Sequence, residues 1–306
     1  MAPERITYTA PQQFPESIDW DAKHQRFLVG SVLRGNVMGV YQDGTAKELV
    51  KDMEYKGCGT LGITVDAPRN RVVVTIKSNA PAPNYNAVAG YDLHSGERLF
   101  LTPLNDVPCS NPPREMPVFA NDSAVDPKTG EIYTTDTHRS LIWKCKADGS
   151  DPVVFAASPL FESFPTVFEM FPLGLNGLVV HENGYIITFN LRQGVGFKVP
   201  LDGSEPSHIA IDGVFPGADG IRLRPDGRLV VTTNDNVYLV ESSDEWRSAK
   251  ILETVPQDPT ISTTAVAIKD GRAYINYAWF AEAYGGKQRS EFYMQTADFE
   301  IDRAEK

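Results

Sequence analysis

Short runs of alternating apolar and polar residues fill most of the chain, and one pattern of them recurs six times. Each copy begins at a polar or otherwise distinctive residue, continues as a short apolar strand, turns at Asp, Pro, Asn or Gly, and ends in a second apolar strand. The copies start at Glu16, Leu61, Asn121, Asn176, Asp219 and Thr263. Their starts are 45, 60, 55, 43 and 44 residues apart, a period typical of propeller blades rather than of helical solenoids.

A third apolar strand follows each copy and ends in a turn, as in NVMGVYQDG, residues 36–44. Such turns are typical of antiparallel hairpins, and about four strands per repeat are expected. The N-terminal segment ERITYT, residues 4–9, has strand character as well. The sequence therefore predicts an all-β, six-bladed β-propeller, a single domain over residues 1–306. In it the N-terminal strand closes the last blade and leaves no open sheet edge.

The composition is that of a folded globular protein, because 42% of the 306 residues are hydrophobic and 10% are aromatic. The formal net charge of -11 argues against nucleic acid or an anionic membrane as a partner, since like charges repel. No apolar run reaches the roughly 18 residues of a membrane helix, and the N-terminus lacks a secretion-signal pattern. The three cysteines form no Cys-x-x-Cys pair. We expect a cytoplasmic protein, a monomer or weak dimer, that binds a small molecule.

In a propeller the innermost strands run along the central channel, so the residues that start them converge on one ring at one face. Four of the six starting residues carry a side-chain carboxylate or carboxamide: Glu16, Asn121, Asn176 and Asp219. Hard oxygen ligands without Cys or His suit Ca2+ better than zinc or copper, and other divalent cations also accept them. Buried together without a cation, these groups would be costly.

Asn121 has two other interpretations. Asn121-Asp122-Ser123 is formally a glycosylation sequon, and Asn and Asp are common at strand starts because they stabilise turns. The repeat places Asn121 beside the channel, where a glycan has no room, and a turn role accounts for Asp122 and Ser123. A turn role leaves unexplained why Asn121 shares its ring with three other oxygen-bearing residues.

Four of the strand starts resemble a known family. The segments FPESIDWD, FANDSAVDPKTG, LNGLVV and GADGIRLRPDGRL are similar to motifs of the senescence marker protein/gluconolactonase/regucalcin family of six-bladed propellers. That family includes diisopropyl fluorophosphatase and, more distantly, paraoxonase and strictosidine synthase. The resemblance covers all six repeats and points to the plant and fungal gluconolactonase-like branch. It implies calcium ligands at Glu16, Asn121, Asn176 and Asp219, with Asp219 also the catalytic acid/base.

One position departs from the family pattern. Sugar lactonases of the family often carry Arg two residues before the third-blade Asn, where it holds polar substrate groups, and this chain has Phe119. We therefore expect a more apolar substrate than an aldonolactone. The expected substrate-contact residues are Phe119, Tyr85, His138, Arg192, Asn234 and Tyr277. For His138, a solvated loop position is the alternative.

These features predict a calcium-dependent hydrolase that acts on a lactone or ester, or on a phosphoester, of a fairly apolar small molecule. A cyclase, isomerase or lyase with a structural metal is the first alternative, and a non-catalytic binding propeller is the second. The Phe-rich insert at residues 155–172 is either a lid or apolar wall over the site, or loop residues packed on the blade edges.

Overall fold

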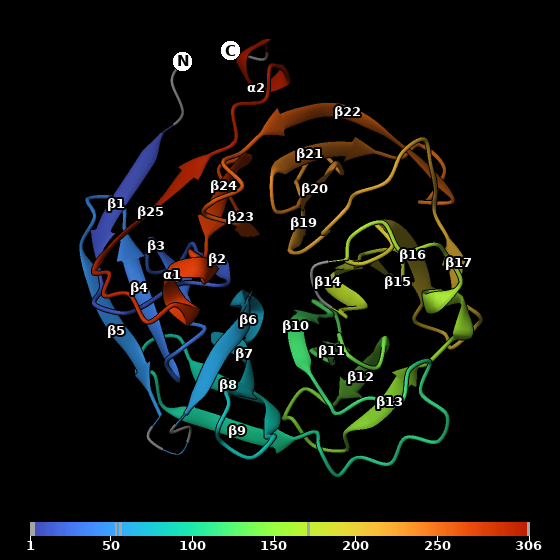
Figure 1. The fold of residues 1–306 in the computed structure, drawn as a ribbon, viewed down its shortest axis with the longest axis horizontal. Helices are drawn as coiled ribbons and strands as arrows, with labels where there is room; N and C mark the ends of the chain where they lie inside the picture. The colour runs from blue at the N-terminus through green and yellow to red at the C-terminus, as the bar shows by residue number, and fades with distance from the viewer. Residues whose placement is uncertain (1–3, 53, 55–56, 170–171, 305–306) are drawn as a thin grey trace.

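The computed structural model describes residues 4–52, 54, 57–169 and 172–304. Its strands form six small, mainly antiparallel sheets arranged in a ring, as Figure 1 shows. This arrangement confirms the predicted all-β, six-bladed propeller. No helix in the described part of the chain is long and apolar enough to cross a membrane.

Each blade has its first strand at the central channel and its last strand at the rim. The first three blades contain β2 (Ile18–Asp21), β3 (Arg26–Val29), β4 (Asn36–Tyr41) and β5 (Ala46–Lys51); β6 (Cys58–Asp66), β7 (Arg71–Ser78), β8 (Asn86–Asp92) and β9 (Arg98–Pro103); and β10 (Ala120–Val125), β11 (Ile132–Asp136), β12 (Leu141–Cys145) and β13 (Val153–Ala156). The fourth and fifth contain β14 (Leu175–His181), β15 (Tyr185–Asn190), β16 (Val195–Pro200) and β17 (Ser207–His208); and β19 (Ile221–Leu223), β20 (Leu229–Thr232), β21 (Asn236–Glu241), β22 (Ser248–Pro256) and the parallel edge strand β18 (Ala210–Ile211). The sixth contains β23 (Thr263–Lys269), β24 (Arg272–Tyr277), β25 (Glu291–Thr296) and β1 (Arg5–Thr9). The short helices are η2 (Ala67–Arg69), η3 (Pro159–Glu162), α1 (Phe280–Tyr284) and α2 (Ile301–Ala304).

The N-terminal strand closes the last blade, as predicted. β1 pairs with β25 in antiparallel register, with Ile6 opposite Met294 and Tyr8 opposite Phe292. Ile6 and Tyr8 are 3% and 2% exposed, whereas the alternate residues of β1 face solvent. Because a shift of one residue would expose this apolar face, its burial fixes the register.

The inner strands of blades two to six have a β-bulge near their starts. Register shifts occur in β6, β10, β14 and β23, at the residues with which the predicted repeats begin. In blade five, Asp219 N donates to Thr232 O and Thr232 N donates to Gly220 O, so two residues again oppose one. A bulge takes side chains out of the regular alternation of a strand. The bulge residues of β10, β14 and β23 line the channel.

Hydrogen bonds at the level of these bulges join each blade to the next. The donors and acceptors, taken round the ring from blade one, are Ile63 N to Ser17 Oγ (3.2 Å), Thr75 Oγ1 to Asn121 O, Leu178 N to the Asp122 carboxylate, Gly177 N to Asp219 O (3.1 Å), Gly220 N to Thr264 O (2.7 Å) and Thr264 Oγ1 to Glu16 O (2.6 Å). A Cβ atom at position 177 would lie 2.2 Å from Asp219 O, so this contact requires Gly177. The links thus pass through all six blades and return to the first.

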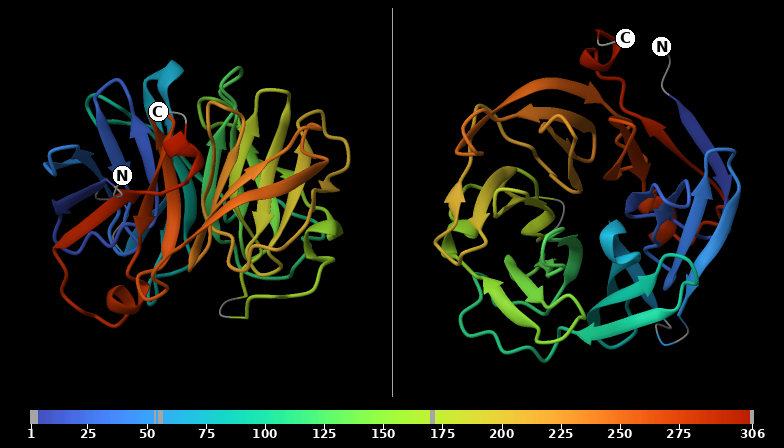
Figure 2. Two further views of the ribbon diagram at one scale, coloured as in Figure 1. Left: turned by 90° about the horizontal axis from the view of Figure 1, so that it is seen from above. Right: turned by 180° about the vertical axis from the view of Figure 1, so that it is seen from behind.

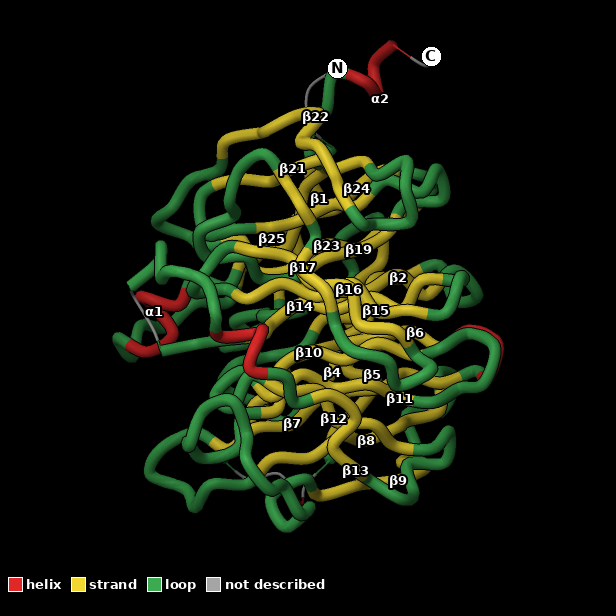
Figure 3. The backbone as a smooth tube through the Cα atoms, turned by 90° about the vertical axis from the view of Figure 1, so that its right-hand side faces the viewer, coloured by secondary structure: helices red, strands yellow, loops and turns green. Residues whose placement is uncertain are grey.

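The two faces of the ring carry different loops. Figures 2 and 3 show α1 and the loop after η3 projecting from one face, and the η2 turn projecting from the other. The loop after η3 leads into β14, and α1 follows β24, whose last residue Tyr277 pairs with the first residue of β23. The starts of the inner strands therefore lie at the face with α1, which we call the mouth face.

Substitution of Tyr8 tests the closure of the ring. Tyr8→Ala removes a buried ring whose centroid lies 6.1 Å from that of Phe292. We expect the free energy of unfolding, measured by urea denaturation, to fall by about 3–5 kcal/mol. Thr7→Ala, on the exposed face of the same strand, is the control and should stay within about 0.5 kcal/mol of the wild type. Equal effects of the two substitutions would show that β1 contributes little to closure.

Candidate functional site

The structure brings the four predicted oxygen-bearing residues together at the mouth face. Glu16, Asn121, Asn176 and Asp219 line one small cavity with a volume of about 10 Å³. The other lining residues are Ser17, Asp122, Gly220, Thr264 and Ala265. A cavity of this size has room for about one water molecule or one ion.

The polar groups of this cavity are shielded from solvent. Glu16 is 7% exposed, Asn121 5% and Asn176 2%. Glu16 Oε2 is buried and has no hydrogen-bond partner among the described residues. Because an unsatisfied buried acceptor costs about 1–3 kcal/mol, the protein alone leaves this site electrostatically incomplete.

The carboxyl groups raise one another's pKa. Burial, followed by the charges of Asp219 and Asp122, raises the pKa of Glu16 well above its usual range. Burial and the charge of Asp122 raise the pKa of Asp219, while a hydrogen bond from the Asn176 side chain lowers it. Burial also raises the pKa of Asp122 to about 6. A bound cation would favour the ionised forms and oppose these shifts.

Arg222, from β19, reaches across the channel to other blades. Its Nη2 atom donates to Ile63 O of blade two at 2.7 Å and lies 3.9 Å from Asp19 Oδ2 of blade one. Its charge opposes the rise in the pKa of Asp122 in blade three. Within the part of the chain that the structure describes, no ion pair joins a basic side chain to Glu16 or Asp219. Arg222 therefore offsets the charges of Asp19 and Asp122, whereas no described basic side chain forms an ion pair with Glu16 or Asp219.

The donor set fits a hard divalent cation. Two carboxylates and two carboxamides are oxygen donors of the kind that Ca2+ takes, and they leave coordination positions for water or substrate. Among residues 4–52, 54, 57–169 and 172–304, no group of three or more His, Cys, Asp or Glu side chains is arranged to hold a metal ion. An ion in this cavity would therefore need the oxygens of Asn121 and Asn176.

The turn interpretation of Asp122 and Ser123 is wrong. Both residues lie inside β10, where they are 6% and 0% exposed. Asp122 lines the cavity beside Asn121 and accepts a hydrogen bond from Ser123 N at 2.8 Å. Because the bulge places two consecutive residues on the channel side, alternation along the sequence could not reveal Asp122.

Phe119 and His138 lie against each other near this site. Their rings meet edge to face with centroids 4.8 Å apart. His138 Nδ1 lies 3.2 Å from Pro117 O, and burial lowers the pKa of His138. The imidazole is therefore neutral at pH 7, and with Nδ1 as the donor to Pro117 its Nε2 atom is an acceptor.

Two of the remaining predicted substrate residues are held by the blades. Tyr277 is 1% exposed, and its hydroxyl donates to Gln257 Oε1 at 2.9 Å, so it belongs to the core and offers no surface to a substrate. Tyr85 is partly buried and packs against the apolar core of blade two.

Arg192 and Asn234 lie in loops of the mouth face but make contacts of their own. Arg192 forms an ion pair with Glu162. Asn234 Nδ2 lies 3.5 Å from Pro259 O. Neither residue lines the cavity that holds Glu16 and Asp219.

The Phe-rich insert packs on the blade edges, the second of its two predicted roles. Phe161 is fully buried in the core, and Glu162 accepts from Ser140 Oγ and from Asn190 Nδ2, which fastens the insert to blades three and four. A Cβ atom at Gly217, two residues before Asp219, would lie 3.5 Å from the Phe168 ring. The insert therefore packs on the blade edges, with Phe168 near Gly217. Residues 170 and 171 lie outside the described residues.

Tyr284, at the end of α1, is a further aromatic residue at the mouth. It is 65% exposed, yet desolvation and then the charge of Glu16 raise its pKa. The sequence gives no signal for Tyr284, because α1 follows β24 within a loop that has no repeat counterpart.

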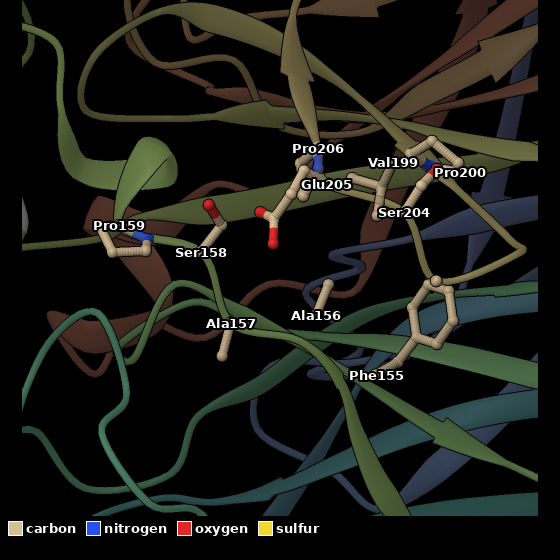
Figure 4. A pocket seen from close by; sticks show the side chains of 11 residues that line it. Phe155, Ala156, Ala157, Ser158, Pro159, Val199, Pro200, Ser204, Glu205 and Pro206 are labelled. Carbon is tan, nitrogen blue, oxygen red and sulfur yellow. The ribbon is translucent and has the colours of Figure 1, made fainter.

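A larger cavity, of about 210 Å³, lies away from the channel. Figure 4 shows it between the end of β13 and the turn from β16 to β17. Its lining is mostly Ala, Pro and Ser, and Glu205 is its one ionisable residue. Of these two cavities, the smaller channel cavity is the one that brings several ionisable and amide groups together.

No known family model matches this chain, and no curated protein matches its sequence. Solved structures do match its fold. The major allergen Mala s 1 of Malassezia sympodialis has a TM-score of 0.78 at 19% identity, over 97% of each chain. A gluconolactonase from Xanthomonas campestris has a TM-score of 0.61 at 17% identity, over 96% of this chain and 91% of that one. The virginiamycin B lyase of Staphylococcus aureus has a TM-score of 0.61 at 10% identity, over 96% and 99%. These likenesses show the fold.

The clustered carboxyl groups predict that the metal-free protein loses stability as the pH rises. Folding raises the pKa values of Glu16, Asp219 and Asp122, so above about pH 4 the folded state binds more protons than the unfolded chain. The free energy of unfolding should therefore fall by up to about 1.4 kcal/mol per pH unit for each group until its folded pKa is passed. Urea denaturation in EDTA from pH 4 to pH 8 measures this slope.

Glu16→Gln should flatten the slope and stabilise the metal-free protein at pH 7. Asp136→Asn is the matched control, since burial raises the pKa of Asp136 to about 6 outside the cavity. It should flatten the slope only below about pH 6. A wild-type stability that rises with pH in EDTA would contradict the electrostatic description of the site.

Proposed function

We propose that this chain is a calcium-dependent hydrolase that opens a lactone or an ester of a fairly apolar small molecule at the channel mouth. A phosphoester is a further candidate substrate. The observation that carries the proposal is the pair Glu16 and Asp219, which lines one cavity with two carboxamides and has no ion pair with a described basic side chain. Such a cluster is stable in its ionised form only with a cation.

Glu16, Asn121, Asn176 and Asp219 would hold the ion. When bound, Ca2+ polarises the substrate carbonyl and offsets the negative charge that develops on its oxygen. Asp219 accepts a proton from the attacking water, or attacks the carbonyl carbon itself. The hydrogen bond from Asn176 orients the Asp219 carboxylate for either role. Arg222 crosses the channel to blades one and two, so we expect the substrate to enter from the mouth face.

The residues around the mouth favour an apolar substrate body. Phe119 precedes Asn121 by two residues, Phe168 lies near Gly217, and Tyr284 lies on the Glu16 side. Aromatic side chains of this kind bind apolar groups and leave few hydrogen-bond donors for the hydroxyl groups of a sugar. We therefore expect an alkyl or aryl lactone or ester rather than an aldonolactone.

The strand-start motifs and the solved structures support an enzymatic role. The motifs resemble those of the senescence marker protein/gluconolactonase/regucalcin family, and the fold is shared with a gluconolactonase and with a luciferin-regenerating enzyme. The same fold in virginiamycin B lyase keeps a lyase as the alternative reaction. Because both reactions occur on this fold, the residues of the site determine whether the chain is a hydrolase or a lyase.

Calcium-dependent turnover is the direct test. The purified chain is assayed with δ-decalactone, glucono-δ-lactone and 4-nitrophenyl esters, in Ca2+ and in EDTA. We expect hydrolysis in Ca2+, loss of activity in EDTA, and faster turnover of δ-decalactone than of glucono-δ-lactone. Asp219→Asn should lower kcat/KM by about 100-fold or more, because it removes the general base or nucleophile.

Asp202→Asn, in an exposed turn, is the control and should leave kcat/KM unchanged. Activity that survives both EDTA and Asp219→Asn would exclude the proposed mechanism. Products without incorporated oxygen from labelled water would instead indicate a lyase.

A further inference from the structure

One ammonium group near the channel mouth has no carboxylate partner. Lys77 is the penultimate residue of β7, and its Nζ atom donates to Ser78 O at 3.2 Å. The same atom lies 4.7 Å from the centre of the Phe119 ring. Within the described residues no carboxylate pairs with Lys77, and burial lowers its pKa.

Two other shielded lysines of the chain are paired with carboxylates. Lys144 Nζ lies 3.0 Å from Glu131, and Lys269 Nζ lies 2.5 Å from Asp270. Carboxylates are abundant in a chain with a net charge of -11, yet none of the described ones forms an ion pair with Lys77. Burial of an unpaired ammonium is unfavourable, and a ligand that brings the missing anion removes this cost.

The register places Lys77 on the mouth side of a contact with Asn121. Thr75, two residues earlier in β7, donates from Oγ1 to Asn121 O. Because side chains two residues apart share one face of a strand, Lys77 lies about 7 Å further toward the mouth face than Thr75. Phe119, two residues before Asn121, occupies the same level and contacts both Lys77 and His138.

We propose that Lys77 binds an anionic oxygen group of the substrate, such as a carboxylate, while Phe119 and His138 hold the apolar segment between that group and the reacting carbonyl. The inference rests on the proposed function and narrows its substrate class. The substrate is then an amphiphilic ester or lactone that carries an acidic group on the Lys77 side of the bond that is broken.

A pair of matched esters tests this specificity. 4-Nitrophenyl hexanoate is neutral, and mono-4-nitrophenyl adipate carries one carboxylate at the end of a chain of the same length. We expect Lys77→Met to raise KM for the adipate ester by about 10-fold or more, with kcat little changed and the hexanoate ester affected less than about 3-fold. Lys77→Arg should keep the preference for the adipate ester.

Lys47→Met is the matched control, since Lys47 lies over the Tyr41 ring on the exposed strand β5. Lys47→Met should leave KM and kcat unchanged for both esters. If Lys77→Met slows both esters equally, or leaves their ratio at the wild-type value, Lys77 is only a packing residue and the proposal is wrong. The urea midpoint of each variant shows whether it is folded.

A binding experiment separates this inference from the proposed function. If the wild type hydrolyses neither ester, hexanoate and hexanamide are titrated calorimetrically into the wild type and into Lys77→Met. Tighter binding of hexanoate that is lost in the variant supports the anion site without hydrolysis. Equal binding of the two probes to the wild type overturns it.

Discussion

Hydrogen bonds near the starts of the inner strands join each blade to the next. A blade of four strands cannot bury both of its faces alone, so the ring is stable only when neighbouring blades are in contact. The bulges provide that contact with backbone and hydroxyl groups, as in the bond from Gly220 N to Thr264 O. Because the bulge residues are then fixed on both sides, their side chains have little freedom to move away from the channel.

This constraint explains why the acidic cluster persists. The backbone carbonyls of Glu16 and Asp219 accept inter-blade hydrogen bonds, while their carboxylates project into the cavity. Separation of the two charges would require the ring itself to open. The closed ring therefore keeps the two carboxylates close together despite their repulsion. The site is organised before any ligand binds.

The six blades and the ring of inner-strand residues can be predicted from the sequence, because the repeat follows the alternation of buried and exposed positions in each blade. The spacing of the copies predicts six blades, and registering them places Glu16, Asn121, Asn176 and Asp219 on one ring. The position of Asp122 in the cavity could not be predicted, because the bulge in β10 interrupts the two-residue alternation on which the alignment depends. The prediction that Tyr277 contacts the substrate is wrong for a different reason. Alternation at the end of a strand does not show which face is buried, and the Tyr277 ring lies in the core.

Contacts between blades are harder to predict than contacts within them. Lys77 and Phe119 belong to neighbouring blades, and Arg222 reaches two blades that are more than 150 residues away in the sequence. No local pattern encodes such pairs, because they depend on the angle between blades and on the length of the side chain. The repeat predicts which residues lie on the ring, whereas the residues that surround them depend on these long-range contacts.

The two ring positions without a carboxylate or carboxamide make the site asymmetric. Thr263 Oγ1 donates to Thr233 O, so the hydroxyl in blade six is already engaged. Leu61, in blade two, belongs to the apolar cluster against which Phe119 packs. The polar residues therefore occupy blades one, three, four and five, and the side at blade two is apolar. Glu16, Asn121, Asn176 and Asp219 would hold the ion, and a substrate bound on the blade-two side would lie against Leu61 and Phe119, toward Lys77.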